Sequence, residues 1–399
     1  MSLVRPAVGT LRTLPPLALY VHIPWCVRKC PYCDFNSHEI PSTSGLRETN
    51  LDGNLEEKYV AALIADLEQS LPLVWGRRII SIFFGGGTPS LMSAHALDEL
   101  LCAIRARLPL APDAEITLEA NPGTFEAKKF HDFRAAGVNR LSIGIQSFNA
   151  HHLRALGRIH DEVQARAAIG IAQREFDNFN LDLMYALPGQ TVSEALSDLE
   201  IATSFAPRHV SAYHLTIEPN TVFAKFPPKV PDDETSADMQ EGIEALLAAR
   251  GYRHYETSAF AQPGCEARHN LNYWSYGDYL GIGAGAHGKL SFPDHIVRQV
   301  RYRAPRDYLT HALQDSPVSQ QNEVKIEERP FEFMLNALRL NDGFESRLFE
   351  ERTGVALSTI LPRLDAAERD GLIVRDHLRI QPTRQGQRFL NDLLQRFLP

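Results

Sequence analysis

The stretch Tyr20-Val-His-Ile-Pro-Trp-Cys26-Val-Arg-Lys-Cys30-Pro-Tyr-Cys33-Asp-Phe35 holds three of the five cysteines of this 399-residue chain. The spacing is C-x3-C-x2-C, and it follows an apolar run, residues 17–22, typical of a buried strand. Three thiolates can bind three irons of a [4Fe–4S] cube and leave the fourth iron without a protein ligand. A metal with an open position can bind a small molecule. The stretch therefore predicts a strand that ends in an iron–sulfur loop.

Other uses of these cysteines are less consistent with the chain. A disulfide framework is disfavoured by the odd cysteine count, the length and the absence of a secretory signal. A zinc site with His22, Asp34 or His38 as fourth ligand stays an alternative, although zinc loops usually carry paired knuckles. Three unrelated buried thiols are the weakest explanation, because the loop around Pro31 is hydrophilic.

Composition limits the class of protein. The chain is 44% hydrophobic and 23% charged, which is typical of a globular protein with a sizeable core, and its length suggests two domains. A net charge of −8 argues against a surface coated for nucleic-acid binding. No uncharged apolar run reaches the roughly 18 residues of a membrane span, and residues 1–16 lack the apolar segment of a signal peptide. Free cysteines and an oxygen-sensitive cluster predict a cytoplasmic location.

Apolar runs alternate with helical patterns over the first half of the chain. Strands are expected at residues 17–22, 79–84, 115–119, 140–145, 180–185 and 209–216. Helices are expected at residues 56–71, 93–108, 127–136, 161–174 and 193–205. Six such units predict a parallel sheet with helical crossovers, and the unbroken apolar runs indicate strands covered on both faces. The alternation alone does not separate an open sheet from a barrel.

Polar or glycine-rich residues follow strand after strand. They are the three cysteines, residues 85–89, Glu119, Gln146, Asp182 and residues 216–219. In parallel α/β barrels the site is built from the carboxyl ends of the strands and the loops after them. The pattern therefore favours a barrel-like fold with one pocket above one cluster.

The rest of the chain does not show this regular alternation of strand and helix patterns. A helix is expected at residues 233–250 and a strand at 252–259, then an irregular segment at 264–288 and a proline-containing linker at 293–317. Residues 326–399 predict helices at 331–340, 344–352, 357–369 and 384–397 with a hairpin at 372–380, an arrangement similar to a winged helix. These residues hold 11 Arg, no Lys and 12 acidic residues, so we expect a packing or partner domain without a DNA-binding role. The expected division is a flexible 1–16, a barrel 17–250, a completing segment 251–325 and a C-terminal domain 326–399.

Single residues at the strand ends suggest ligand contacts. The triple glycine 85–87 lacks the phosphate-loop pattern; it indicates close backbone approach to a ligand, or a tight turn before Pro89. Glu119 and Asp182 could hydrogen-bond ribose hydroxyls or an ammonium group, and Arg158 could pair with a ligand carboxylate. Taken singly, such charges are more often structural or solvated.

A second unusual cluster is Arg268-His269-Asn270-Leu-Asn272-Tyr273-Trp274. A histidine can ligate haem iron, and flat aromatic rings can pack against a porphyrin. The plainer alternative, which the residues alone favour, is a turn whose aromatics plug the barrel. Cys265, four residues before His269, could assist as a thiolate.

Taken together, residues 20–26, 85–90, 144–147 and 182–189 resemble the oxygen-independent coproporphyrinogen III oxidase group of the radical S-adenosylmethionine (SAM) proteins, over nearly the whole chain. The resemblance implies a partial (β/α)6 barrel. Within the group, two features are more similar to its haem chaperones. Phe35 stands where the oxidases have a fourth cysteine, and His269-Asn270-x-x-Tyr273-Trp274 resembles the chaperones' haem-binding motif.

The resemblance implies a role for each matching residue. Cys26, Cys30 and Cys33 would hold the [4Fe–4S] cluster. The implied SAM contacts are Tyr20, Tyr32, Gly86, Gly87, Thr88, Glu119, Gln146, Arg158, Asp182, Thr216 and His287. The implied haem contacts are His269, as axial ligand, with Asn270, Tyr273 and Trp274. In many relatives a cysteine lies closer to the histidine of the haem motif, so a role for Cys265 is in doubt.

The resemblance implies a haem chaperone that carries the cluster and SAM and passes haem to an acceptor protein, without substrate turnover. The alternative is radical SAM oxidative decarboxylation of coproporphyrinogen III, for which no residue replaces the missing fourth cysteine. Modification of a nucleic acid is disfavoured by the acidic balance. The residues identify neither the acceptor nor the second axial ligand, and they leave SAM cleavage, homodimer formation and peripheral membrane contact open.

Overall fold

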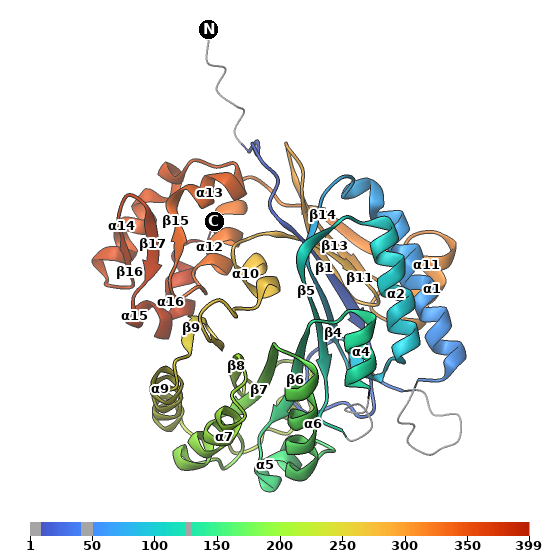
Figure 1. The fold of residues 1–399 in the computed structure, drawn as a ribbon. Helices are drawn as coiled ribbons and strands as arrows, with labels where there is room; N and C mark the ends of the chain where they lie inside the picture. Colours follow the sequence, from blue (N-terminus) through green and yellow to red (C-terminus); the bar gives the residue numbers. More distant parts are fainter. Residues whose placement is uncertain (1–8, 41–50, 124–128, 399) are drawn as a thin grey trace.

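The fold is built on a 12-stranded sheet, seen in a computed structural model that describes residues 9–40, 51–123 and 129–398 (Figure 1). Six parallel strands lie side by side in chain order: β1 (Leu17–Ile23), β4 (Ile79–Gly86), β5 (Leu110–Ala120), β6 (Arg140–Gln146), β7 (Phe179–Tyr185) and β8 (His209–His214). The other neighbour of β1 is β11 (Asp278–Ile282) and not β8, so the barrel stays open. The predicted partial (β/α)6 barrel is confirmed.

Helices connect the parallel strands. They are α1 (Gly53–Ser70), α2 (Ala94–Arg107), α4 (Phe130–Ala136), α5 (Ala150–Ala155), α6 (Glu162–Glu175) and α7 (Val192–Ser204), with short 3-10 turns η1 (Leu71–Leu73) and η2 (Pro89–Leu91). Two of them start at a capping box, Asp161 with Gln164 for α6 and Thr191 with Glu194 for α7. Their apolar faces form one large core with the sheet. Residues 127–128 of the predicted third-unit helix lie outside the described residues.

After β8 come α8 (Val222–Lys225) and α9 (Asp233–Ala249), and then the sheet is extended at both edges. β9 (Arg253–Glu256) and β10 (Ala259–Ala261) are added antiparallel beside β8. β12 (His287–Ser291), β13 (Ile296–Arg301) and β14 (Val318–Glu323) are added antiparallel beyond β11. Two helices, α10 (Arg268–Trp274) and α11 (Pro305–Gln314), lie between these strands in sequence.

The predictions of an irregular segment at 264–288 and a linker at 293–317 were therefore wrong. Buried ion pairs with residues from the first part of the chain hold these residues in the sheet. Arg301 on β13 contacts Asp66 on α1 at 2.9 Å, and both side chains are 0% exposed. Asp278 on β11 pairs with Lys289 on β12 at 2.9 Å and with Arg77, just before β4, at 2.8 Å. Breaking such a pair would leave an uncompensated buried charge, so the two segments are firmly joined to the barrel.

The C-terminal module has a three-stranded sheet in the order β15-β17-β16 (Figure 1). Its elements are α12 (Arg329–Ala337), β15 (Phe344–Glu345), α13 (Ser346–Thr353), η3 (Leu357–Ile360), α14 (Leu361–Arg369), β16 (Ile373–Arg375), β17 (Arg379–Pro382), α15 (Arg384–Arg388) and α16 (Leu390–Gln395). The predicted hairpin is confirmed, whereas the predicted last helix is interrupted at Phe389. Leu11 and Tyr276 pack into the module's own core. The exact domain boundaries stay a prediction.

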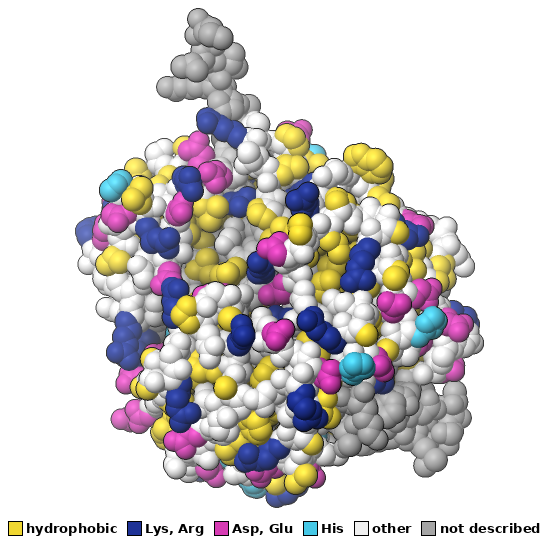
Figure 2. All heavy atoms as spheres, in the orientation of Figure 1, with side chains coloured by type: hydrophobic (Ala, Val, Ile, Leu, Met, Phe, Trp, Pro, Cys, Tyr) yellow, Lys and Arg dark blue, Asp and Glu magenta, His cyan; other side chains and the backbone are white. Residues whose placement is uncertain are grey.

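The surface gives no sign of a nucleic-acid footprint on the face drawn in Figure 2, where basic and acidic side chains are interspersed without a continuous basic stripe. Within the described ranges, every helix is too short or too polar to cross a membrane.

A buried histidine next to the barrel makes stability depend on pH. His160 is 6% exposed, its Nε2 donates to the carbonyl oxygen of Ile145 at 3.1 Å, and burial lowers its pKa to about 3. Between about pH 6.5 and pH 3 the unfolded chain therefore binds a proton that the folded chain does not, so stability falls as pH falls. We expect His160→Gln to reduce the slope of the free energy of unfolding against pH by about 1 kcal/mol per pH unit. Urea unfolding at pH 7, 6 and 5 would measure this slope.

His131 supplies the control for that measurement. It is exposed, and its hydrogen bond with Glu175 raises its pKa, so the stability it contributes is lost as pH rises. His131→Gln should leave the acid-side slope as steep as in the wild type. An equal slope in His160→Gln and wild type would contradict the prediction.

Candidate functional site

The cysteine loop is folded against the carboxyl ends of β1 and β4. Its first cysteine ends β2 (Trp25–Cys26), which pairs with β3 (His38–Glu39) and closes the loop at its base. Trp25 is buried and lies edge-on to the Tyr59 ring at 4.6 Å. Cys26, Cys30 and Cys33 are half-buried free thiols. The loop is thus fixed by its base while its thiols remain accessible.

The donor set fits an iron–sulfur cluster better than a single zinc ion. No three His, Cys, Asp or Glu side chains of the described residues converge closely enough to hold one ion. His22, one fourth ligand considered for the zinc alternative, already uses both ring nitrogens, with the Tyr20 hydroxyl at 3.0 Å and the Asn36 carbonyl oxygen at 2.9 Å. Burial raises the pKa of Cys26 to about 11, so a bound metal has to stabilise the thiolate. A set of three thiols suits a [4Fe–4S] cube with one iron left open.

A chain of polar contacts joins two of the cysteines. The Thr88 hydroxyl donates to Cys26 Sγ at 3.5 Å and accepts from Asn121 Nδ2 at 2.9 Å. Arg158 donates to Asn121 Oδ1 at 2.6 Å and to Cys30 Sγ at 3.8 Å. Asn121 was missed by sequence reasoning, although its position just past the end of β5 was a usable signal. These contacts orient the loop across three strand ends.

The triple glycine is required by the protein's own backbone. Gly87 N–H donates to the Ile23 carbonyl oxygen at 2.7 Å, and a Cβ on Gly87 would lie 2.5 Å from the Trp25 carbonyl oxygen. Gly86 has φ of +113°, and its Cβ would lie 2.5 Å from the His22 ring. The glycines therefore let β4 approach the cysteine loop.

We expect Gly87→Ala to destabilise the fold by about 1–3 kcal/mol, because the added methyl group meets backbone that cannot move freely. Chemical unfolding would measure the loss. Gly53→Ala is the matched control, because nothing lies within 4 Å of its Cβ position. Equal stabilities of the two variants would show that the loop accommodates the methyl group.

Two carboxylates face the barrel interior. Burial and the nearby Asp182 raise the pKa of Glu119 to about 8, although the Gly86 N–H donates to its Oε2 at 3.2 Å. Burial also raises the pKa of Asp182, which accepts from the Ser142 hydroxyl and from Asn180 Nδ2, each at 2.8 Å. Asp182 is largely satisfied within the protein, whereas Glu119 keeps capacity for a ligand hydroxyl or ammonium.

The backbone at the end of β6 is strained. Gln146 has φ of +67°, and the register with β7 shifts between Gly144 and Gln146. Non-glycine residues in this conformation concentrate at functional sites. This geometry is consistent with the ligand role expected for Gln146.

A cavity of about 620 Å³ joins the two predicted sites. It is lined by Tyr20, His22, Asp34, Phe35, Asn36, Gly86, Glu119, His269, Asn270, Tyr273, Trp274, Tyr279, Gly285, His287 and Arg303. All four predicted haem contacts and four predicted SAM contacts are in this list. The volume lies within the range of about 300–1,000 Å³ found for small-molecule sites.

His269 lies on α10, which contacts β1, β4 and β11. Its Nδ1 and the Ser81 hydroxyl lie 3.2 Å apart, and its ring lies 5.0 Å from that of Phe83. Burial, with the charge of Arg140, lowers its pKa to about 4, so the imidazole is neutral at pH 7. Its Nε2 has no hydrogen-bond partner in the described part of the chain. A neutral imidazole held through one nitrogen suits metal ligation by the other.

Aromatic rings cover much of the remaining wall. Tyr273, 37% exposed, packs edge-on to Trp274 at 5.0 Å and against Tyr279 at 5.1 Å. Phe35 is 61% exposed at the mouth. The cavity is thus suited to a flat, largely apolar ligand.

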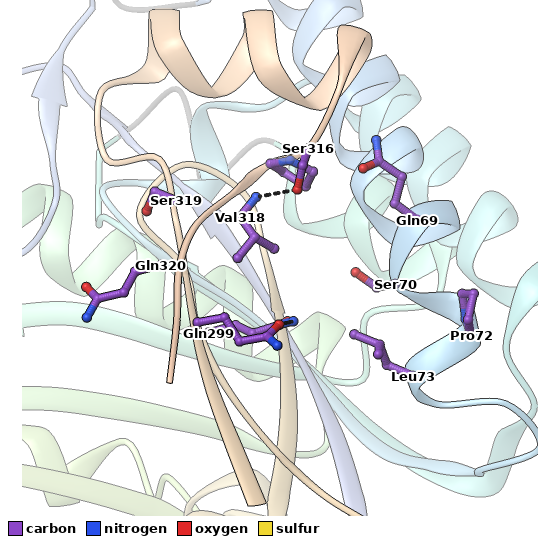
Figure 3. A pocket seen from close by; sticks show the side chains of 11 residues that line it. Gln69, Ser70, Pro72, Leu73, Gln299, Ser316, Val318, Ser319 and Gln320 are labelled. Carbon is purple, nitrogen blue, oxygen red and sulfur yellow. Dashed lines mark hydrogen bonds between the residues drawn. The ribbon is translucent and has the colours of Figure 1, made fainter. Parts of the chain in front are cut away.

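The other predicted SAM contacts do not line this cavity. Tyr32 packs with Phe223 in a small cluster beside the cysteine loop, and Thr216 is exposed after β8. Gly87, Thr88, Gln146, Arg158 and Asp182 lie at or near the strand ends described above. A further cavity of about 420 Å³ between α1 and the β13–β14 edge is lined by Gln, Ser, Pro, Leu and Val alone, and it holds no titratable group (Figure 3).

Comparison with known proteins defines the class. A sequence profile of the radical SAM superfamily matches residues 20–202, and one of the HemN C-terminal domain matches residues 325–389. The solved structure of coproporphyrinogen III oxidase (HemN) from Escherichia coli superposes with a TM-score of 0.79 over 96% of this chain and 90% of that chain. At 24% identity this likeness shows a shared fold. The chain is a radical SAM protein.

Curated relatives narrow the class to one family. The chain is 48% identical to the "Heme chaperone HemW" of Escherichia coli, over 96% of this chain and 99% of the relative. It is 46% identical to the protein of that name from Haemophilus influenzae, over 96% and 98%, and 34% identical to that from Bacillus subtilis, over 95% and 98%. The chain belongs to the HemW family of heme chaperones. The family match favours the chaperone function over the oxidase alternative.

Proposed function

We propose that this protein binds haem in the 620 Å³ cavity, with His269 as an axial ligand, and delivers it to an acceptor protein. The observation that carries the proposal is the position of His269. A neutral imidazole with an unpartnered Nε2 stands among aromatic rings beside the cysteine loop. The names of the HemW relatives support the same function.

We further propose that Cys26, Cys30 and Cys33 hold a [4Fe–4S] cluster and that the neighbouring strand ends hold SAM. The Arg158 guanidinium beside Cys30, the glycine backbone of Gly86 on the cavity wall, and the protonated Glu119 support this assignment. Tyr20, Tyr32, Thr88, Gln146, Asp182, Thr216 and His287 are the other proposed SAM contacts. A bound cluster supplies one-electron redox chemistry.

The presence of Phe35 indicates that the redox chemistry of the cluster is not used to convert a substrate. It occupies the position of the oxidase group's fourth cysteine, and the described part of the chain offers no other cysteine at the cavity wall. We therefore propose a chaperone that acts in the cytoplasm without converting its ligand.

The test is an anaerobic transfer assay with cluster-reconstituted protein. Haem is bound first, and apomyoglobin is then added as a generic acceptor. The expected result is a Soret shift on binding, followed by the spectrum of holo-myoglobin at a rate above that of free haem release. Formation of protoporphyrinogen from coproporphyrinogen III, SAM and a reductant would overturn the proposal, and so would a failure to bind haem.

A further inference from the structure

One cation on the wall of the cavity has no assigned role. Arg303 is the single Arg or Lys among the lining residues, all of which belong to the described part of the chain. Its side chain is exposed, and no carboxylate of the described residues lies within ion-pair distance of it. The nearby Arg298 differs, because its guanidinium is committed to Glu332 at 2.8 Å. The cavity therefore carries one guanidinium that is available to a ligand.

The position of Arg303 is fixed through its backbone. Asn36 Nδ2 donates to the Arg303 carbonyl oxygen at 2.8 Å and to the Ala284 carbonyl oxygen at 2.9 Å. A Cβ on Gly285 would lie 2.3 Å from Asn36 Nδ2, so the amide is tightly enclosed. Asn36 follows the third cysteine by three residues. The backbone that carries this guanidinium is thus held at the rim by the residues that follow the third cysteine.

The chemistry of this site suits a carboxylate. A guanidinium presents five donors in a planar fork that matches a carboxylate in a bidentate geometry. The charges of Arg298 and Arg303 help to lower the pKa of His287, after the larger effect of burial, so both guanidinium groups act on this part of the wall. Aromatic walls with one cation at the edge suit a flat apolar ligand that carries a carboxylate at its periphery.

We infer that Arg303 anchors a carboxylate side chain of the tetrapyrrole bound in this cavity. The inference rests on the proposed function, because haem is a flat macrocycle with two propionate groups. SAM also carries a carboxylate, but Arg158 stands beside Cys30 at the strand ends and is the better placed partner for it. Arg303 lines the cavity that also holds the four residues of the haem motif, whereas Arg158 does not line it.

The test compares haem with its dimethyl ester, in which both propionates lose their charge. Full-length wild type, Arg303→Met and Arg306→Met are titrated with each compound and with SAM. Arg306 is the control, because it is an exposed arginine three residues further on that does not line the cavity. Wild type and Arg306→Met should bind haem about tenfold more tightly than the ester, and Arg303→Met should bind the two about equally.

The other outcomes are distinguishable. If Arg303→Met keeps the wild-type preference for haem over the ester, the inference is overturned while the proposed function stands. If its affinity for SAM falls and that preference is kept, the carboxylate belongs to SAM and the tetrapyrrole assignment fails. If the wild type binds neither porphyrin, the proposed function fails and the inference fails with it.

Discussion

Cys30→Ser is expected to lose most of its iron–sulfur cluster when reconstituted with iron and sulfide in the absence of oxygen. A serine hydroxyl does not deprotonate at neutral pH as a thiol can, and a cluster held by three cysteines has no spare ligand. Arg158, which donates to Cys30 Sγ at 3.8 Å, would also lose its contact with the cluster loop. We expect iron and acid-labile sulfide to fall to about a tenth of the wild-type value or less, and SAM binding to fall with them.

Two other cysteines provide matched controls for that variant. Cys102 is exposed on α2, and Cys265 is half-buried before α10, outside the cysteine loop. Cys102→Ser and Cys265→Ser should both keep the full iron content. A normal cluster in Cys30→Ser would contradict the assignment. Loss of iron in Cys265→Ser would instead identify a fourth cysteine ligand and reopen the question of an open iron site.

Local sequence signals were sufficient for the parallel half of the fold. The six parallel strands are buried over most of their length and are largely apolar, because both faces are covered, and the helices between them show buried stripes such as Val60, Leu63 and Leu67 on α1. Capping boxes at Asp161 and Thr191 mark where two helices begin. The strand ends could then be predicted to converge, since parallel strands finish on one side of a barrel.

Long-range pairing could not be predicted in the same way. The strands between residues 278 and 323 are stabilised by partners such as Asp66 for Arg301, which is 235 residues away, and no periodicity reports such a pair. For the same reason, the sequence did not show that the two predicted sites share one cavity. His269 is near Ser81, 188 residues earlier, and Asn36 fixes Arg303, 267 residues later. Residue types predicted a cluster loop and a haem motif separately, whereas only the fold placed them on one wall.

His269→Ala is the variant with the largest expected effect on haem binding, because it removes the proposed axial ligand from the cavity wall. Losing a residue that supports a metal ligand typically costs 10–100-fold in affinity, so losing the ligand itself should cost about 100-fold or more. The Soret band should shift as well, because the iron loses an imidazole nitrogen. Absorbance titration of the reconstituted protein, with iron content measured in parallel, would separate haem loss from cluster loss.

A second histidine, His295, provides the control for His269→Ala. His295 is a surface histidine stacked on Phe292 at 4.6 Å and does not line the cavity, so His295→Ala should bind haem as the wild type does. Added imidazole should partly restore the Soret band of His269→Ala, because the space left beside Ser81 can accept the free ring. Unchanged affinity and spectrum in His269→Ala would remove the imidazole from the iron. Haem binding would then depend on the aromatic rings of Tyr273, Trp274 and Tyr279, and the axial ligand would have to be another residue.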